Sequence, residues 1–67
     1  MAKLKIKQFY YHIDENNTLF IFNSVGNSVA HVSEVTYDFE TIKMIVEDVL
    51  YNMGMIKETE DINLTRM

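Results

Sequence analysis

The amino-acid sequence predicts an α+β fold: a three-stranded antiparallel β-meander followed by one amphipathic helix. The first observation is a change in the spacing of apolar residues, which alternate in the N-terminal half and recur at helical spacing after position 38. The second is that Asn and Gly, which favour turns, interrupt the alternating part at two places. The third is the length of 67 residues, which corresponds to one domain spanning residues 1–67.

Three stretches of the N-terminal half have the alternation and the aromatic and β-branched content that are typical of strands. We predict strands at about residues 3–13, 18–25 and 28–36. Between them, Asn16-Asn17 and Gly26-Asn27 predict two-residue hairpin turns, because Asn and Gly tolerate a positive φ better than other residues.

The second half of the chain predicts one helix at about residues 39–53, where apolar residues follow helical spacing. Asp38 is suited to the N-cap, because its carboxylate can accept the free N–H groups of the first turn. Gly54 is suited to end the helix in a left-handed conformation. The tail, residues 57–67, becomes polar and acidic, and we expect it to fray unless Met55 and Ile56 dock on the core.

The predicted turns also fix the register of the meander, because successive side chains of a strand point to opposite faces. Two-residue turns would place His12 in a row with Ile21 and Val32 on one face. They would place His31 on the other face, so that the two histidines of the chain could not share a metal ion or a proton.

Both predicted faces of the sheet are rich in apolar residues, whereas a single helix covers only one of them. A chain of this size buries only about 60% of the surface of its unfolded form, and small domains often gain stability from a partner. We therefore expect a homo-oligomer, formed through the uncovered face or the flank of the helix. The residues predicted to self-associate are Tyr10, Ile21, Val32, Met44, Tyr51 and Met55.

The sequence offers little for catalysis or cofactor binding. It contains no cysteine, which excludes disulfides and thiolate metal sites, and it lacks a glycine-rich phosphate loop and the common catalytic motifs. Under the predicted register His12, Asp14 and Glu34 share one face, but no serine or cysteine nucleophile accompanies them. We interpret them as polar residues at the rim of the sheet and predict no catalytic, cofactor or metal site.

The positive charges gather at the N-terminus, where Lys3, Lys5 and Lys7 form a basic stripe on one side of the first strand. Beside Tyr10 and Tyr11, this stripe could bind a single-stranded nucleic acid. Lysines also protect an exposed strand edge from unwanted pairing, which is the interpretation we favour. A net charge of −4 argues against a general affinity for nucleic acid.

Negative charges dominate the second half of the chain. Glu40, Glu47 and Asp48 lie on the polar side of the predicted helix, where they could dock on a basic partner or imitate a nucleic-acid backbone. Lys43 interrupts this acidic side and is spaced to pair with Glu40 and Glu47. A solvated helix surface is therefore the simpler interpretation.

These observations predict a small non-catalytic protein, a homo-oligomeric regulator or adaptor that acts by binding another protein. No signal peptide is visible and no apolar run reaches the ~18 residues of a membrane span, so we expect a soluble, cytoplasmic protein without a membrane partner. Its size, acidity, many Asn and Ile, and lack of Pro and Trp are shared by small accessory proteins of phages and mobile elements, a likeness of composition alone. An acidic nucleic-acid-mimicking inhibitor and a weak single-stranded nucleic-acid binder stay open as alternatives.

Overall fold

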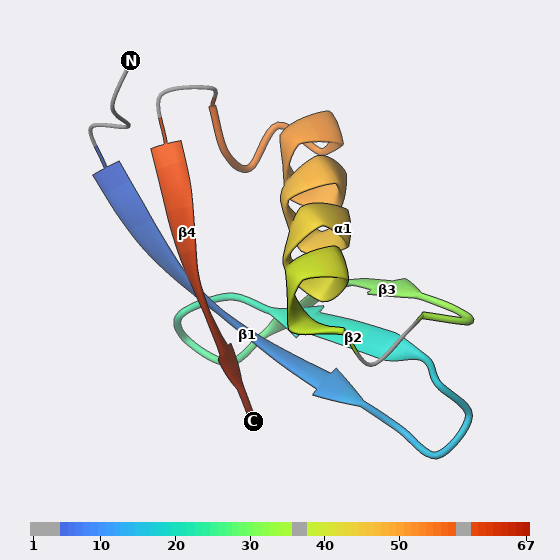
Figure 1. The fold of residues 1–67 in the computed structure, drawn as a ribbon. Helices are drawn as coiled ribbons and strands as arrows, with labels where there is room; N and C mark the ends of the chain where they lie inside the picture. Colours follow the sequence, from blue (N-terminus) through green and yellow to red (C-terminus); the bar gives the residue numbers. More distant parts are fainter. Residues whose placement is uncertain (1–4, 36–37, 58–59) are drawn as a thin grey trace.

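The computed structural model has two layers, one four-stranded mixed sheet and one helix (Figure 1). It describes residues 5–35, 38–57 and 60–67. The elements are β1 (Lys5–Ile13), β2 (Leu19–Phe22), β3 (Ser28–Val32), α1 (Phe39–Asn52) and β4 (Glu60–Arg66), and the strand order is β3-β2-β1-β4. The predicted α+β class is confirmed, whereas the prediction of three strands is wrong because a fourth strand follows the helix.

The turn between β1 and β2 contains three residues between the paired Asp14 and Thr18. The N–H of Asp14 donates to the carbonyl of Thr18, and the N–H of Asn17 donates to the carbonyl of Asp14. Asn17 has a φ of 60°, and the Asp14 carboxylate accepts the N–H groups of Asn16 and Thr18. This is a hairpin in which a turn is followed by one residue in the left-handed region.

The turn between β2 and β3 repeats the same construction. Asn23 takes the place of Asp14, its side chain accepting the N–H groups of Val25 and Asn27, and Gly26 supplies the positive φ of 88°. Both predicted two-residue turns are therefore wrong, because each loop contains three residues. The Asp or Asn that opens each loop selects the longer turn by bonding the backbone ahead of it.

The longer turns change the register of β2 by one residue relative to the prediction. His12 lies opposite Phe20, and Phe20 lies opposite His31. The register between β2 and β3 shifts at an irregularity between Ile21 and Phe22. As a result His12 and His31 lie on the same face of the sheet, so the prediction that they occupy opposite faces is wrong.

Helix α1 begins and ends as the sequence predicts. The Asp38 side chain accepts hydrogen bonds from the hydroxyl and the N–H of Thr41, at 2.8 and 3.0 Å, and these bonds hold the pKa of the carboxyl below its ordinary value of 3.8. At the other end Gly54 has a φ of 76°, and the N–H of Met55 donates to the carbonyl of Leu50. These are the marks of a left-handed helix stop at glycine.

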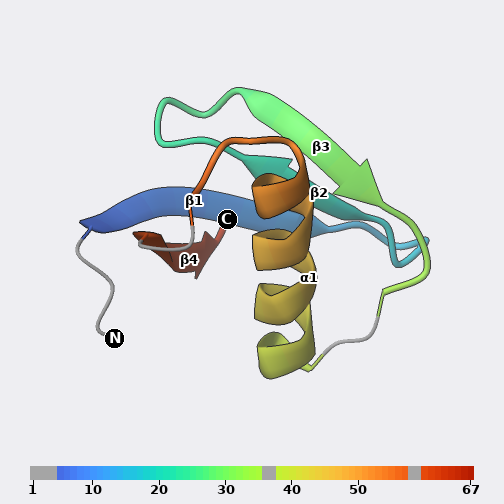
Figure 2. The same cartoon turned by 90° about the horizontal axis from the view of Figure 1, so that it is seen from above.

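The sequence predicted that residues 57–67 fray unless Met55 and Ile56 dock on the core. Ile56 is buried and Met55 packs against the core, and residues Glu60–Arg66 form the strand β4. It pairs with β1 in parallel along its whole length, from Lys5 opposite Glu60 to Tyr11 opposite Arg66. Its side chains alternate, so that Ile62 is buried and Asn63 is exposed. Because β3 also runs parallel to β1, α1 is the crossover between two parallel strands, and it passes over one side of the sheet only (Figure 2).

A polar anchor fixes the start of β4. Glu60 is 7% exposed, and its carboxylate accepts the N–H of Lys57 at 2.8 Å. Lys7 of β1 lies 3.3 Å from the same carboxylate and also donates to the carbonyl of Met55 at 2.9 Å. Lys7 therefore joins β1 to both the crossover segment and β4.

The core lies between α1 and one side of the sheet. The helix contributes the buried stripe of Ile42, Val46 and Leu50. The rest of the core comprises Phe9, Tyr11, Ile13, Leu19, Ile21, Val35, Ile56, Ile62 and Leu64. Among the described residues, no helix is both long enough and apolar enough to cross a membrane.

Candidate functional site

Two surfaces lie outside this core: the face of the sheet opposite α1, and a hollow beside the helix. The first surface, here called the open face, follows from strand alternation, since every second side chain of β1, β2 and β4 points into the core. The open face includes Ile6, Gln8, Tyr10, His12, Phe20, Phe22, Ser28, His31, Asp61, Asn63 and Thr65.

Three strands give the open face an aromatic half. Tyr10 lies opposite Phe22, and the row next to it consists of His12, Phe20 and His31. The rings of Phe20 and His31 have centroids 6.1 Å apart and are tilted by 34°. Aromatic pairs across neighbouring strands stabilise a sheet, but here they also leave ring surface at the outside of the molecule.

The other half of the open face is polar and satisfied within the sheet. Gln8 of β1 donates to the Thr65 hydroxyl at 3.1 Å and accepts from the Asn63 amide at 2.8 Å. These bonds tie β1 to β4 on the side away from the helix. The polar half therefore resembles the rim of a protein interface, where hydrogen-bonding groups surround an apolar centre.

The open face carries little charge. Lys7 and Arg66 are in register with the buried residues of β1 and β4, on the side of the helix. Among the side chains that the structure describes, the open face thus holds no lysine or arginine, and Asp61 is its one carboxylate. Phosphate groups would find no cation there to replace their counterions.

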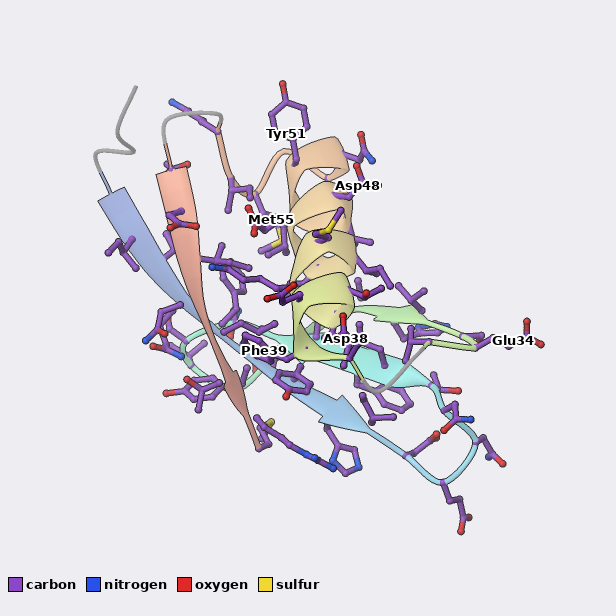
Figure 3. The ribbon with its side chains drawn as sticks, viewed as in Figure 1. Glu34, Asp38, Phe39, Asp48, Tyr51 and Met55 are labelled. Carbon is purple, nitrogen blue, oxygen red and sulfur yellow. The ribbon has the colours of Figure 1, made fainter. Side chains whose placement is uncertain are left out.

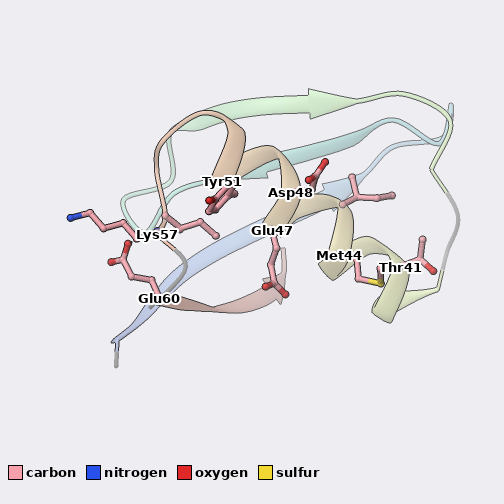
Figure 4. A pocket seen from close by; sticks show the side chains of 9 residues that line it. Thr41, Met44, Glu47, Asp48, Tyr51, Lys57 and Glu60 are labelled. Atoms are coloured by element: carbon pink, nitrogen blue, oxygen red, sulfur yellow. The ribbon is translucent and has the colours of Figure 1, made fainter. Parts of the chain in front are cut away.

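The second surface is an open hollow of about 730 Å³ between α1 and the crossover to β4 (Figure 4). Met44 and Tyr51 are 71% and 48% exposed there. The lining residues are Thr41, Met44, Ile45, Glu47, Asp48, Tyr51, Ile56, Lys57 and Glu60. Figure 3 shows Asp48 and Tyr51 on the C-terminal half of α1 and Met55 in the segment that follows it.

The residues predicted to self-associate are divided among three places. Tyr10 lies on the open face, Met44 and Tyr51 line the hollow, and Met55 packs half-buried against the core. Ile21 is fully buried and Val32 packs against the core, because the register places both on the side of the helix. The surface predicted around these two residues is thus the covered side, and the uncovered one is the open face.

The predicted acidic residues do not form one continuous row. Glu47 and Asp48 line the hollow, while Glu40 lies in the first turn of α1 outside it. Glu47 has an interaction partner. Within the described part of the chain, the exposed Asp48 carboxylate makes no hydrogen bond or ion pair with another residue.

The predicted basic stripe is not assembled with its two tyrosines. Tyr11 is buried, its ring 6.1 Å from that of Phe39, whereas Tyr10 lies on the opposite side of the sheet. Lys7 is engaged with Glu60. Lys3 lies outside the described residues, and only the backbone of Lys5 is described.

The predicted rim residues His12, Asp14 and Glu34 each have a different setting. His12 is exposed on the open face, and Asp14 builds the first turn through its two backbone hydrogen bonds. Glu34 is exposed and has a φ of 59° in the segment after β3. No group of three or more potential metal-binding side chains occurs among the described residues.

The prediction missed Phe20, Phe22 and His31 as residues of the uncovered face. A signal was present: both loops begin with Asp or Asn and have Asn or Gly at the fourth position, counted from Asp14 and Asn23. That pattern favours the three-residue loop over a two-residue turn.

Comparisons of the chain with models of protein families, with curated proteins and with solved structures gave no match.

Proposed function

We propose that this chain is a small non-catalytic interaction protein that acts by binding protein, and that copies of it associate through the open face. The observation that carries the proposal is the aromatic half of that face, centred on Tyr10, Phe20 and Phe22, which no described element covers. As the sequence predicts, we place the action of the protein inside the cell.

A second copy of the chain is the partner that best fits the open face. Uncovered sheet faces are commonly buried by stacking a second sheet about 10 Å away. Around a two-fold axis, the same patch on both copies would bury its aromatic half against its equivalent. The hydrogen-bonded half around Gln8 would then lie at the edge of the contact.

The charge of the open face favours protein over nucleic acid. Stacking of bases on aromatic side chains is accompanied by cations that track the phosphates. The described side chains of this face include no lysine or arginine, and the whole chain is acidic. Aromatic residues with few charged neighbours are instead typical of the centre of a protein interface.

The test compares two substitutions to lysine, one of the half-buried Phe20 and one of the exposed Met44. Phe20→Lys places a charge in the middle of the open face, and Met44→Lys places the same charge beside the hollow. Light scattering over a dilution series should find that the wild type and Met44→Lys associate, whereas Phe20→Lys is monomeric. Circular dichroism should show that Phe20→Lys is still folded. A wild type that is monomeric up to millimolar concentration, or dissociation caused by Met44→Lys alone, would reject association through the open face.

A second candidate function, the acidic inhibitor that occupies a nucleic-acid site on an enzyme, is supported by the exposed carboxylates of α1. It requires Glu40, Glu47 and Asp48 to act together, although only the last two border the hollow. Reversing all three charges should abolish binding to a basic target and leave the fold intact. Binding that survives this triple reversal would eliminate the inhibitor.

A further inference from the structure

We infer that the hollow beside α1 binds a basic, amphipathic segment of a partner protein. The inference rests on the proposed protein-binding function, but it uses a surface separate from the open face. The hollow combines an apolar floor, an elongated shape and a negative border, and each of these features restricts the partner.

The exposed apolar side chains of the hollow lie outside the buried core. Ile42, Val46 and Leu50 already form the buried stripe of α1. Met44 and Tyr51 lie beside this stripe and remain 71% and 48% exposed. Met adapts its shape to a partner, and Tyr offers a large ring with a polar end, so both are suited to protein contacts.

The hollow follows the helix rather than enclosing a compact ligand. Thr41, Met44, Asp48 and Tyr51 recur at the spacing of three and four residues that places them along one side of α1. The ten steps from Thr41 to Tyr51 correspond to about 15 Å along the helix axis. That length matches a short peptide segment of about ten residues if helical or about five if extended.

The charge at the border of the hollow is negative. Glu47 and Asp48 lie in the C-terminal half of α1, where the helix dipole is also negative, and the last turn of the helix contains no basic residue. Of the other charged groups, Glu60 is engaged with Lys7, while Lys57 lies at the crossover end. A cation near Asp48 would therefore satisfy a charge that the described part of the fold does not use.

Arginine and lysine side chains complement both properties at once. Their aliphatic stems can lie on Met44 and Tyr51, and a guanidinium can stack on the Tyr51 ring while it bonds the Asp48 carboxylate. Apolar residues on the same side of the segment would fill the floor near Ile56. A segment that alternates basic and apolar residues at helical spacing is the partner that this surface fits.

The probe is a fluorescent synthetic peptide of about 12 residues that carries Arg and Leu at helical spacing, titrated by anisotropy. Wild-type protein should bind it saturably. Asp48→Lys should weaken binding about tenfold, because an attractive contact becomes repulsive. The same change should not lower the melting temperature and should raise it by about 1–3 °C, because lysine suits this part of a helix better than aspartate.

Glu40→Lys is the matched control, since it reverses an exposed carboxylate of the same helix outside the hollow. It should leave peptide affinity within about twofold of the wild type at moderate salt. Phe20→Lys should also leave it unchanged, so that loss of self-association and loss of peptide binding can be told apart. The inference is overturned if the wild type does not bind, if Glu40→Lys and Asp48→Lys weaken binding equally, or if a peptide of scrambled order binds as well.

Discussion

Phe20 and Ile21 are neighbours on the same short strand, yet they belong to surfaces with opposite roles. Ile21 is fully buried beneath α1, whereas Phe20 lies on the open face between His12 and His31. Both sides of the sheet carry large apolar side chains, but the single crossover supplies cover for one side only. Topology, rather than hydrophobicity alone, therefore decides which apolar side of this small sheet becomes the core and which stays uncovered.

The largest expected effect comes from placing lysine on each of these two positions. Ile21→Lys buries a charge and should cost about 4 kcal/mol or more, which is comparable to the about 3–10 kcal/mol expected for a domain of this size. Phe20→Lys should cost only about 1 kcal/mol, the order of one cross-strand pair. Urea unfolding followed by circular dichroism measures both; similar losses at the two positions would show that the open face is part of a core.

An intermediate effect is expected from Lys7→Met, which removes the anchor of β4 and leaves the Glu60 carboxylate buried. Because Lys7 is partly exposed to solvent, the loss should be about 1–2 kcal/mol rather than that of a fully buried pair. Hydrogen exchange should show faster opening of β4 than of β2. If exchange accelerates equally in all strands, the anchor does not act on β4 specifically.

A smaller effect is expected from Gln8→Leu, which extends the aromatic half of the open face into the polar half. Asn63 and Thr65 lose their partner but remain exposed to water, so stability should change by less than about 1 kcal/mol. Self-association should become tighter, as measured by sedimentation over a concentration series. Weaker association would indicate that the polar half makes the decisive contacts.

The smallest effect concerns the start of α1 and is seen in acid. The bonds from Thr41 hold the pKa of Asp38 below its ordinary value of 3.8, so the charged cap stabilises the fold fully above that pH and less as the pH falls through the lowered pKa. Asp38→Ala should lower the melting temperature at neutral pH. The difference from the wild type should shrink below about pH 4, and a difference that is constant down to pH 2 would contradict this role of the cap.

Local patterns in the sequence predicted the helix well, because its start and end depend on single residues next to it. Asp38 and Gly54 act through backbone groups within a few positions, and the spacing of Ile42, Val46 and Leu50 identifies the buried side. The predicted register of the sheet was wrong for a related reason, since it also depends on single residues in a loop. One additional residue in the loop after Asp14 moves every side chain of β2 to the other face.

Strand β4 was not predictable in the same way, because its partner lies at the other end of the chain. Ile62 and Leu64 alternate with polar residues over too short a stretch to outweigh the acidic residues before them. Glu60 is tolerated inside the fold because the ammonium of Lys7, far away in sequence, and the N–H of Lys57 reach its carboxylate. The hollow was equally hidden, since it forms only after the crossover returns beside α1.

We propose that copies of this protein meet at the open face. The most direct measurement is a set of two-dimensional NMR spectra recorded over a dilution series, which reports the residues whose environment changes on association. We expect the signals of Met44 and Tyr51 to remain in place with concentration, whereas the signals of the open face should shift, namely those of Tyr10, Phe20, Phe22 and His31. Shifts confined to α1, or spectra that are identical at all concentrations, would contradict this proposal.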